Sequence, residues 1–108
     1  MSKPWKAAVA QIASVPDDSV ASARKAADAI RKAAGEGARL IVFPEAFLGG
    51  YPKGASFGCP IGMRRPEGRE AYLHYHKAAI DLDGEEVEIV SEATAETETF
   101  IVIGCIER

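Results

Sequence analysis

The sequence predicts an α/β fold, because short apolar runs of strand character alternate with longer segments of helical periodicity. The strongest strand candidates are residues 40–43 and 100–106, which are rich in β-branched and aromatic side chains. The strongest helix candidates are residues 18–34 and 85–97, where apolar residues recur at spacings of three and four. A strand, a helix and a second strand in this order are typical of a parallel sheet.

Composition and charge indicate one small soluble domain at most. The 108 residues are 47% hydrophobic and 27% charged, and 13 basic against 16 acidic residues give a net charge of −3 without a basic block. We therefore expect no nucleic-acid binding. No apolar run approaches the roughly 20 residues that span a bilayer, and no signal core follows Lys6, so we expect neither a membrane segment nor export. Cys59 and Cys105 form no CxxC motif, which fits a reduced, cytoplasmic setting.

The N-terminal part of the chain predicts a strand followed by a helix. Residues 5–12 alternate between two mostly apolar faces, which predicts a strand covered on both sides. Asp and Ser side chains at residues 17–19 can cap the helix over 18–34. Gly35 or Gly37 is expected to end that helix in the left-handed conformation. The expected buried stripe of the helix is Val20, Ala23, Ala27, Ile30 and Ala34.

The C-terminal part predicts a long loop, two helices and a third strand. Residues 53–68 contain four glycines and two prolines, as in loops that either carry function or are disordered. A helix is expected from residue 67 or 69 to 79, and the helix over 85–97 should bury Val87, Ile89, Val90 and Ala93. The strand over 100–106 would leave an open apolar sheet edge. We therefore expect residues 1–108 to be one domain that is incomplete at its C-terminus.

The stretch at residues 40–52, Leu-Ile-Val-Phe-Pro-Glu-Ala-Phe-Leu-Gly-Gly-Tyr-Pro, is the expected functional site. Its first four residues predict a buried strand, which Pro44 ends because proline has no backbone N–H to donate. Glu45 follows at the carboxyl end of the strand, where open α/β folds bind ligands. Its apolar neighbours predict desolvation, which raises the pKa of a carboxyl group towards the working pH of a proton-transfer catalyst.

This stretch resembles a known catalytic motif. Residues 43–52 resemble the first catalytic motif of the nitrilase (carbon–nitrogen hydrolase) superfamily, and residues 37–42 match the family's approach to it. Other segments resemble the nitrilase branch more than the amidase or carbamoylase branches: residues 65–70, Tyr72, Tyr75, residues 79–81 and residues 103–108. Because several motifs occur in order over essentially the whole chain, the resemblance is specific.

The resemblance implies a four-layer αββα sandwich, of which residues 1–108 form the N-terminal part, and a homo-oligomer. It implies an active site of Glu, Lys and Cys with no cofactor or metal, in which Glu45 is the general base. The Cys attacks the nitrile carbon to give a thioimidate, and water releases ammonia and a carboxylic acid through an acyl-enzyme. No residue here matches the family's Lys or Cys motif, so the chain alone is expected to be inactive.

Some residues have both a functional and a structural interpretation. Tyr51 and Phe47 are candidates for substrate binding, with packing as the alternative. For Glu45, the alternative is a helix N-cap or a solvated loop acid. Cys59 and Cys105 are interpreted as structural rather than nucleophilic, because cysteines in such positions usually pack.

Three further features are interpreted without a catalytic role. Lys53 is expected to be a solvated loop residue or a contact at the substrate mouth. His74 and His76 are two residues apart on a predicted helix, so they point to different sides and make a poor metal pair. Gly49 and Gly50 lack the Gly-Lys-Ser/Thr of a phosphate loop.

Two classes of function remain open from the sequence. In the first, the chain supplies the Glu of an enzyme that hydrolyses a small-molecule nitrile, and the Lys and Cys come from the remainder of the domain or from a complementary chain. In the second, the chain is a non-catalytic remnant, or a fragment that associates with intact partners through its sheet edge. A third alternative is an unrelated small α/β binding module that uses the loop after Phe43.

Overall fold

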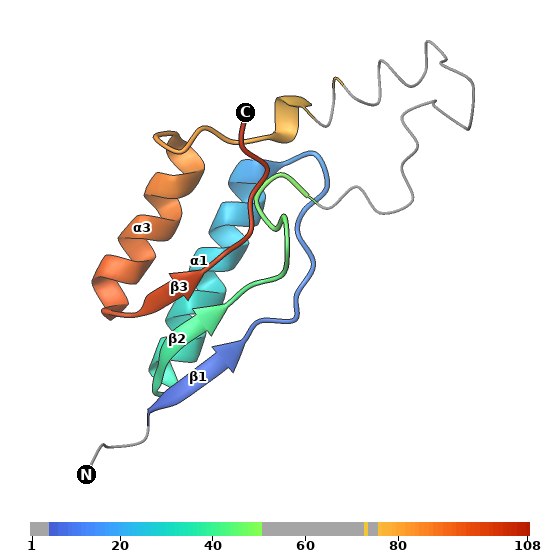
Figure 1. Ribbon diagram of the computed structural model, residues 1–108. Coiled ribbons are helices and arrows are strands. Elements are labelled where there is room, and N and C mark those ends of the chain that lie inside the picture. The colour runs from blue at the N-terminus through green and yellow to red at the C-terminus, as the bar shows by residue number, and fades with distance from the viewer. Residues whose placement is uncertain (1–4, 51–72, 74–75) are drawn as a thin grey trace.

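The computed structural model describes residues 5–50, 73 and 76–108, which form a parallel sheet with helices packed on it (Figure 1). The three strands are β1 (Lys6–Val9), β2 (Ala38–Val42) and β3 (Phe100–Val102), in the order β1-β2-β3. Helix α1 (Ser19–Gly35) connects β1 to β2, and α3 (Glu85–Thr97) precedes β3. The predicted α/β class is confirmed.

The sheet register sorts the strand side chains onto two faces. Ala8, Ile41 and Ile101 are paired across the three strands and belong to the core, with Ile41 fully buried. The next row, Val9, Val42 and Val102, lies on the opposite face because strand side chains alternate.

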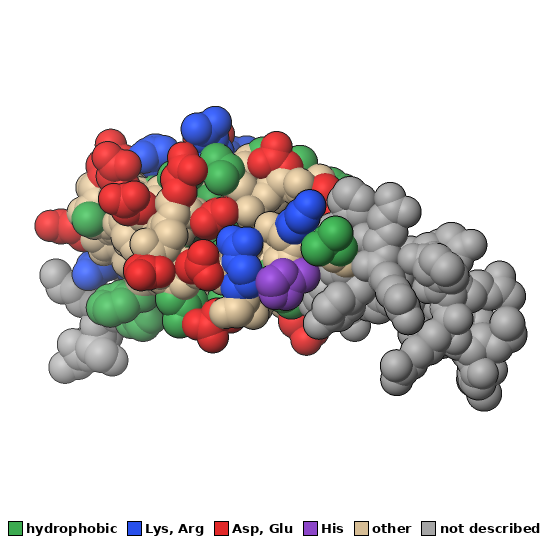
Figure 2. Space-filling model, turned by 90° about the horizontal axis from the view of Figure 1, so that it is seen from above, with side chains coloured by type: hydrophobic (Ala, Val, Ile, Leu, Met, Phe, Trp, Pro, Cys, Tyr) green, Lys and Arg blue, Asp and Glu red, His purple; other side chains and the backbone are tan. Residues whose placement is uncertain are grey.

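That opposite face is open in the described part of the protein. Helices α1 and α3 lie on one side of the sheet (Figure 1), and hydrophobic side chains gather on the other, along the lower side of Figure 2. Val9 is 72% and Phe100 71% exposed, and Trp5, Arg39 and Phe100 line an open hollow of about 270 Å³. The described helices supply a single covering layer, so the expectation of a first strand covered on both sides stays a prediction.

Helix α1 begins and ends much as the sequence predicts. The Asp18 side chain caps it by accepting a hydrogen bond from the Ala21 amide at 2.9 Å. The helix ends at Gly35, and Gly37 takes the positive φ (95°) that the turn into β2 requires. The buried residues are Ser22, Ala23, Ala26, Ala27 and Ile30. The stripe is thus shifted from the predicted one, whose outer members Val20 and Ala34 are only partly buried.

Helix α3 has the predicted bounds and packs against α1. Val90 and Ala93 are buried, whereas the predicted core residues Val87 and Ile89 are only partly buried. Two polar contacts connect the helices: the Ser19 hydroxyl donates to the Glu86 carboxylate at 2.7 Å, and Arg31 pairs with Glu96 at 2.7 Å.

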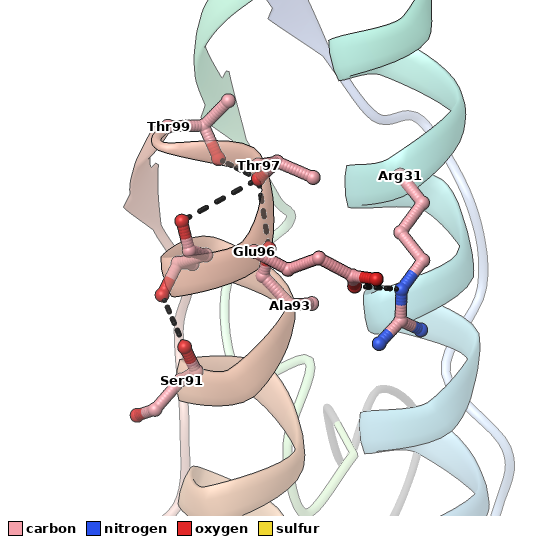
Figure 3. A network of polar contacts seen from close by, with 7 residues as sticks. Arg31, Ser91, Ala93, Glu96, Thr97 and Thr99 are labelled. Carbon is pink, nitrogen blue, oxygen red and sulfur yellow. Dashed lines mark hydrogen bonds and ion pairs between the residues drawn. The ribbon is translucent and has the colours of Figure 1, made fainter.

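The Arg31–Glu96 pair lies beside the polar contacts that end α3 (Figure 3). The hydrogen bond to Glu96 raises the pKa of Arg31, and both side chains are largely solvent-exposed. Near the end of α3, the Thr97 hydroxyl donates to the Ala93 carbonyl at 2.8 Å, and Glu98 takes a left-handed conformation. These contacts direct the chain from α3 into β3.

The segment before α3 is described only in part. Leu73 and residues 76–78 are helical, in agreement with a helix that ends near residue 79. The predicted start of that helix and the loop over 53–68 lie outside the described residues. Among the residues described, no helix is both long and apolar enough to cross a membrane.

Candidate active site

Glu45 lies in a tight turn directly after β2. The strand pairing continues to Phe43, whose amide donates to the Val102 carbonyl at 2.8 Å, and stops at the exposed Pro44. The turn begins at Glu45, and the next residue, Ala46, has a positive φ of 53°. A non-glycine residue in this region costs about 1–2 kcal/mol and persists where the surrounding structure dictates it. The Glu45 turn (residues 45–49) is therefore a constrained part of the chain.

The constraint comes from residues 103–108, the β3 extension. The Leu48 amide donates to the Gly104 carbonyl at 3.0 Å, and the Ile106 amide donates to the Leu48 carbonyl at 2.7 Å. On its other side, the β3 extension exchanges hydrogen bonds with Ile80 at 2.7 and 2.8 Å. It thus runs between two fully buried residues, Leu48 and Ile80.

These contacts explain why the third strand differs from the prediction. The sequence predicts one strand over 100–106, whereas β3 ends at Val102 and its extension forms isolated bridges, Leu48 with Cys105 and Ile80 with Glu107. The β2 ladder stops at Pro44, so β2 offers residues 103–106 no continuous partner. The β3 extension pairs instead with the Glu45 turn.

The carboxylate of Glu45 is directed away from the core that surrounds its backbone. Phe43, Ala46, Phe47 and Leu48 are at most 5% exposed, but Glu45 itself is exposed. The expected desolvation by apolar neighbours is therefore not supplied by the described residues, because those neighbours pack inward while Glu45 points outward. No described helix begins at Glu45, so the N-cap alternative is wrong, and the carboxylate is accessible to a group approaching from outside.

The two substrate-binding candidates have different outcomes. Phe47 is 1% exposed, and its ring packs on Phe43 with centroids 5.5 Å apart. This burial favours the packing alternative for Phe47. Tyr51 lies outside the described residues, so its role stays a prediction.

Of the remaining candidate residues, the structure describes Cys105 and His76. Cys105 is a free thiol, partly buried against the core and paired through its backbone with Leu48, which fits its structural interpretation. His76 is exposed. The candidates outside the described residues are Lys53, Cys59 and His74. Within the described ranges, no three His, Cys, Asp or Glu side chains are grouped as metal ligands.

One residue of the site was not identified from the sequence. Gly104 contributes its carbonyl to the Glu45 turn and lies directly against the turn's backbone. The available signal was an isolated glycine inside a strongly β-prone run, a pattern that indicates close approach of another backbone.

Comparison with protein families identifies the family to which this chain belongs. The family model for carbon–nitrogen hydrolases matches residues 6–108, which includes the Glu45 turn and the β3 extension. The chain belongs to the carbon–nitrogen hydrolase family. This membership confirms the resemblance noted in the sequence and excludes the unrelated binding module.

Curated relatives narrow the resemblance to the nitrilase branch. A nitrilase of Bradyrhizobium diazoefficiens is 67% identical over 104 residues, which are 96% of this chain and 32% of that protein. An aliphatic nitrilase of Sinorhizobium fredii is 48% identical over 96% of this chain and 34% of its own length. A bifunctional nitrilase/nitrile hydratase of Lupinus angustifolius is 43% identical over 95% of this chain and 29% of its own. The chain thus spans about a third of the length of these relatives, at their N-terminal end.

Proposed function

We propose that this chain supplies the general base, Glu45, of a nitrilase-like hydrolase that converts a small-molecule nitrile to a carboxylic acid and ammonia. The observation that carries the proposal is the position of Glu45. It stands in the stretch that resembles the family's first catalytic motif, at the carboxyl end of β2, with its side chain exposed and its turn held by hydrogen bonds to the β3 extension. Nitrilases are also among the most similar curated relatives.

The proposed chemistry gives Glu45 a proton-transfer role. The family's cysteine adds to the nitrile carbon, and its thiol proton passes by way of the Glu45 carboxylate to the nitrile nitrogen, which gives a thioimidate. One water molecule then displaces ammonia and leaves a thioester. A second water molecule releases the carboxylic acid and restores the thiol. An exposed carboxylate on a fixed turn suits this role, because the nucleophile must approach it from another segment.

The proposal includes the parts that the resemblance implies beyond residue 108. The Lys and Cys come from the remainder of the domain or from a complementary chain, and a second sheet covers the open face that carries Val9 and Phe100. This gives the four-layer αββα sandwich, which assembles further into a homo-oligomer in the cytoplasm. The exposed apolar side chains of that face support such a covering layer, because burying them is favourable.

Two other outcomes are separate from this proposal. A non-catalytic remnant would share the fold but support no turnover with any complementary part. The Lupinus relative is named as both a nitrilase and a nitrile hydratase, so the product can be an acid or an amide. The activity assay therefore measures ammonia and amide separately.

The experiment fuses residues 1–108 to the part of the Bradyrhizobium nitrilase that lies beyond its matched region. At 67% identity, the transplanted segment should pack as the native one does. The fusion protein is tested on aliphatic, aromatic and arylacetonitrile substrates, and the unaltered Bradyrhizobium enzyme is the positive control. We expect turnover by the fusion protein, and a fall in kcat of about 10²–10⁴-fold on Glu45→Gln, the range for loss of a general base.

The matched control is Glu92→Gln, which makes the same chemical change at an exposed position on α3. It should leave kcat unchanged. A folded but inactive fusion protein would favour the non-catalytic remnant. Turnover that survives Glu45→Gln would show that this carboxylate is not the base.

A further inference from the structure

Gly104 lies where the backbone of the Glu45 turn passes closest to the β3 extension. A Cβ atom placed on Gly104 would overlap the amide nitrogen of Ala46 and would lie 2.9 Å from both the Cα and the carbonyl carbon of Glu45. These are backbone atoms, so no side-chain rotation can relieve the overlap. A side chain at position 104 must therefore push the Glu45 turn and the β3 extension apart.

Gly49 makes a second close contact between the Glu45 turn and the β3 extension. This residue has a φ of 113°, and a Cβ atom placed on it would lie 2.8 Å from the Cβ of Ile106. The turn and the β3 extension therefore approach each other through two positions at which only glycine fits without displacement. The hydrogen bonds of Leu48 to Gly104 and of Ile106 to Leu48 lie between these two positions.

We propose that Gly104 is a positioning residue for the reaction: the close approach that its missing side chain permits fixes the backbone of Glu45 and so aims the carboxylate. The inference rests on the proposed function of Glu45. It concerns the β3 extension, about 60 residues along the chain from the motif that contains the base. In an active site, a displacement of about 1 Å can lower the rate roughly 100-fold.

The test is Gly104→Ala in the fusion protein, with two independent measurements. Amide hydrogen exchange reports on the turn directly, because the Leu48 amide donates to the Gly104 carbonyl and the adjacent Gly50 amide donates to the Ala46 carbonyl. We expect faster exchange at both amides. Steady-state kinetics report on the position of the Glu45 carboxylate. We expect kcat to fall about 100-fold and KM to change less than threefold, because Gly104 positions the base and does not contact the bound nitrile.

Two control variants separate positioning from general destabilisation. Gly35→Ala makes the same change at the end of α1, where nothing lies within 4 Å of the new methyl group, and should alter neither measurement. Val90→Ala removes buried volume from α3, so it lowers the thermal midpoint but should leave kcat and the exchange of Leu48 unchanged below that midpoint. If Gly104→Ala fails to fold, Gly49→Ala takes its place, since it disturbs the same contact from the turn side: its Cβ atom would lie 2.8 Å from the Cβ of Ile106, at a φ of 113°.

Several outcomes of the Gly104→Ala experiment would contradict the positioning role. Unchanged exchange, or faster exchange with an unchanged kcat, overturns the inference. The inference is also overturned if Gly104→Ala and Val90→Ala lower kcat equally when their thermal midpoints match. The loss of kcat would then reflect lower stability. If the fusion protein without substitutions is inactive, the proposed function fails, and the exchange measurement by itself decides whether Gly104 holds the turn.

Discussion

Substituting Val9 and Val102 with threonine should have opposite effects in the isolated chain and in a complete domain. The two valines share one row of the open sheet face and are 72% and 56% exposed. Threonine keeps the β-branched shape and therefore the strand preference. The substitution thus changes the polarity of the face while it leaves β1 and β3 intact.

The magnitude follows from the area that each valine leaves uncovered. Full burial of a valine contributes about 1.5 kcal/mol, so covering the exposed parts of both contributes about 2 kcal/mol. In a complete domain, a second layer would also bury the two new hydroxyl groups, at about 1–3 kcal/mol each if they find no partner. With both hydroxyl groups unpaired, these contributions predict that the double variant destabilises the fusion protein by about 4–8 kcal/mol.

In the isolated chain, the same change should favour the monomer. The uncovered face presents Trp5, Val9, Phe100 and Val102 to water and should drive self-association. Sedimentation velocity should therefore show a larger monomer fraction for the double variant than for the unsubstituted chain. Urea unfolding of the fusion protein measures the opposite effect. Leu82→Thr is the control, because Leu82 is 58% exposed but lies in the turn before α3, and it should change neither result.

The result that refutes this reasoning is specific. If the double variant changes the unfolding free energy of the fusion protein by less than about 0.5 kcal/mol, the size typical of surface substitutions, the face is not covered by an apolar layer. The four-layer arrangement would then be wrong. A monomeric, soluble unsubstituted chain would contradict the expected self-association separately.

Two further predictions concern the helical layer. Ser22→Ala removes a buried hydroxyl that accepts from the Val15 amide at 2.8 Å, so it should lower the unfolding free energy of the fusion protein by about 1–3 kcal/mol in urea, whereas Ser91→Ala at an exposed position should not. The Arg31–Glu96 pair is solvent-exposed, so Arg31→Gln should leave the thermal midpoint nearly unchanged at 0.15 M salt, and a large, salt-independent fall would contradict this.

The local features of the fold could be predicted because their signals lie close together in the sequence. The bounds of α3, the cap at Asp18 and the end of β2 before Pro44 each follow from residues within one or two turns of chain. The buried polar residues Ser22 and Glu86 were not predicted. Their burial depends on partners 7 and 67 residues away, Val15 and Ser19 respectively, which periodicity cannot reveal.

The family resemblance of the Glu45 stretch could be recognised from the sequence, but the geometry of the turn could not. The motif at residues 43–52 located Glu45, and the family match agrees with that motif. The apolar neighbours suggested a desolvated carboxylate, but the turn sends Phe47 and Leu48 into the core and leaves Glu45 exposed. Residues that are adjacent to Glu45 in the sequence can point to the opposite side of the turn, and the sequence does not show which of them do.

The sequence by itself determined the α/β class, the two helices α1 and α3 and the resemblance to the carbon–nitrogen hydrolase family, because these depend on local periodicity, capping and residue identity. Only the tertiary structure decided which face of the sheet the described helices cover and how the β3 extension passes between Leu48 and Ile80. It also revealed why position 104 holds a glycine. Steric overlap acts between atoms that meet in space, and Gly104 meets Glu45 and Ala46 only after the sheet has brought distant segments together.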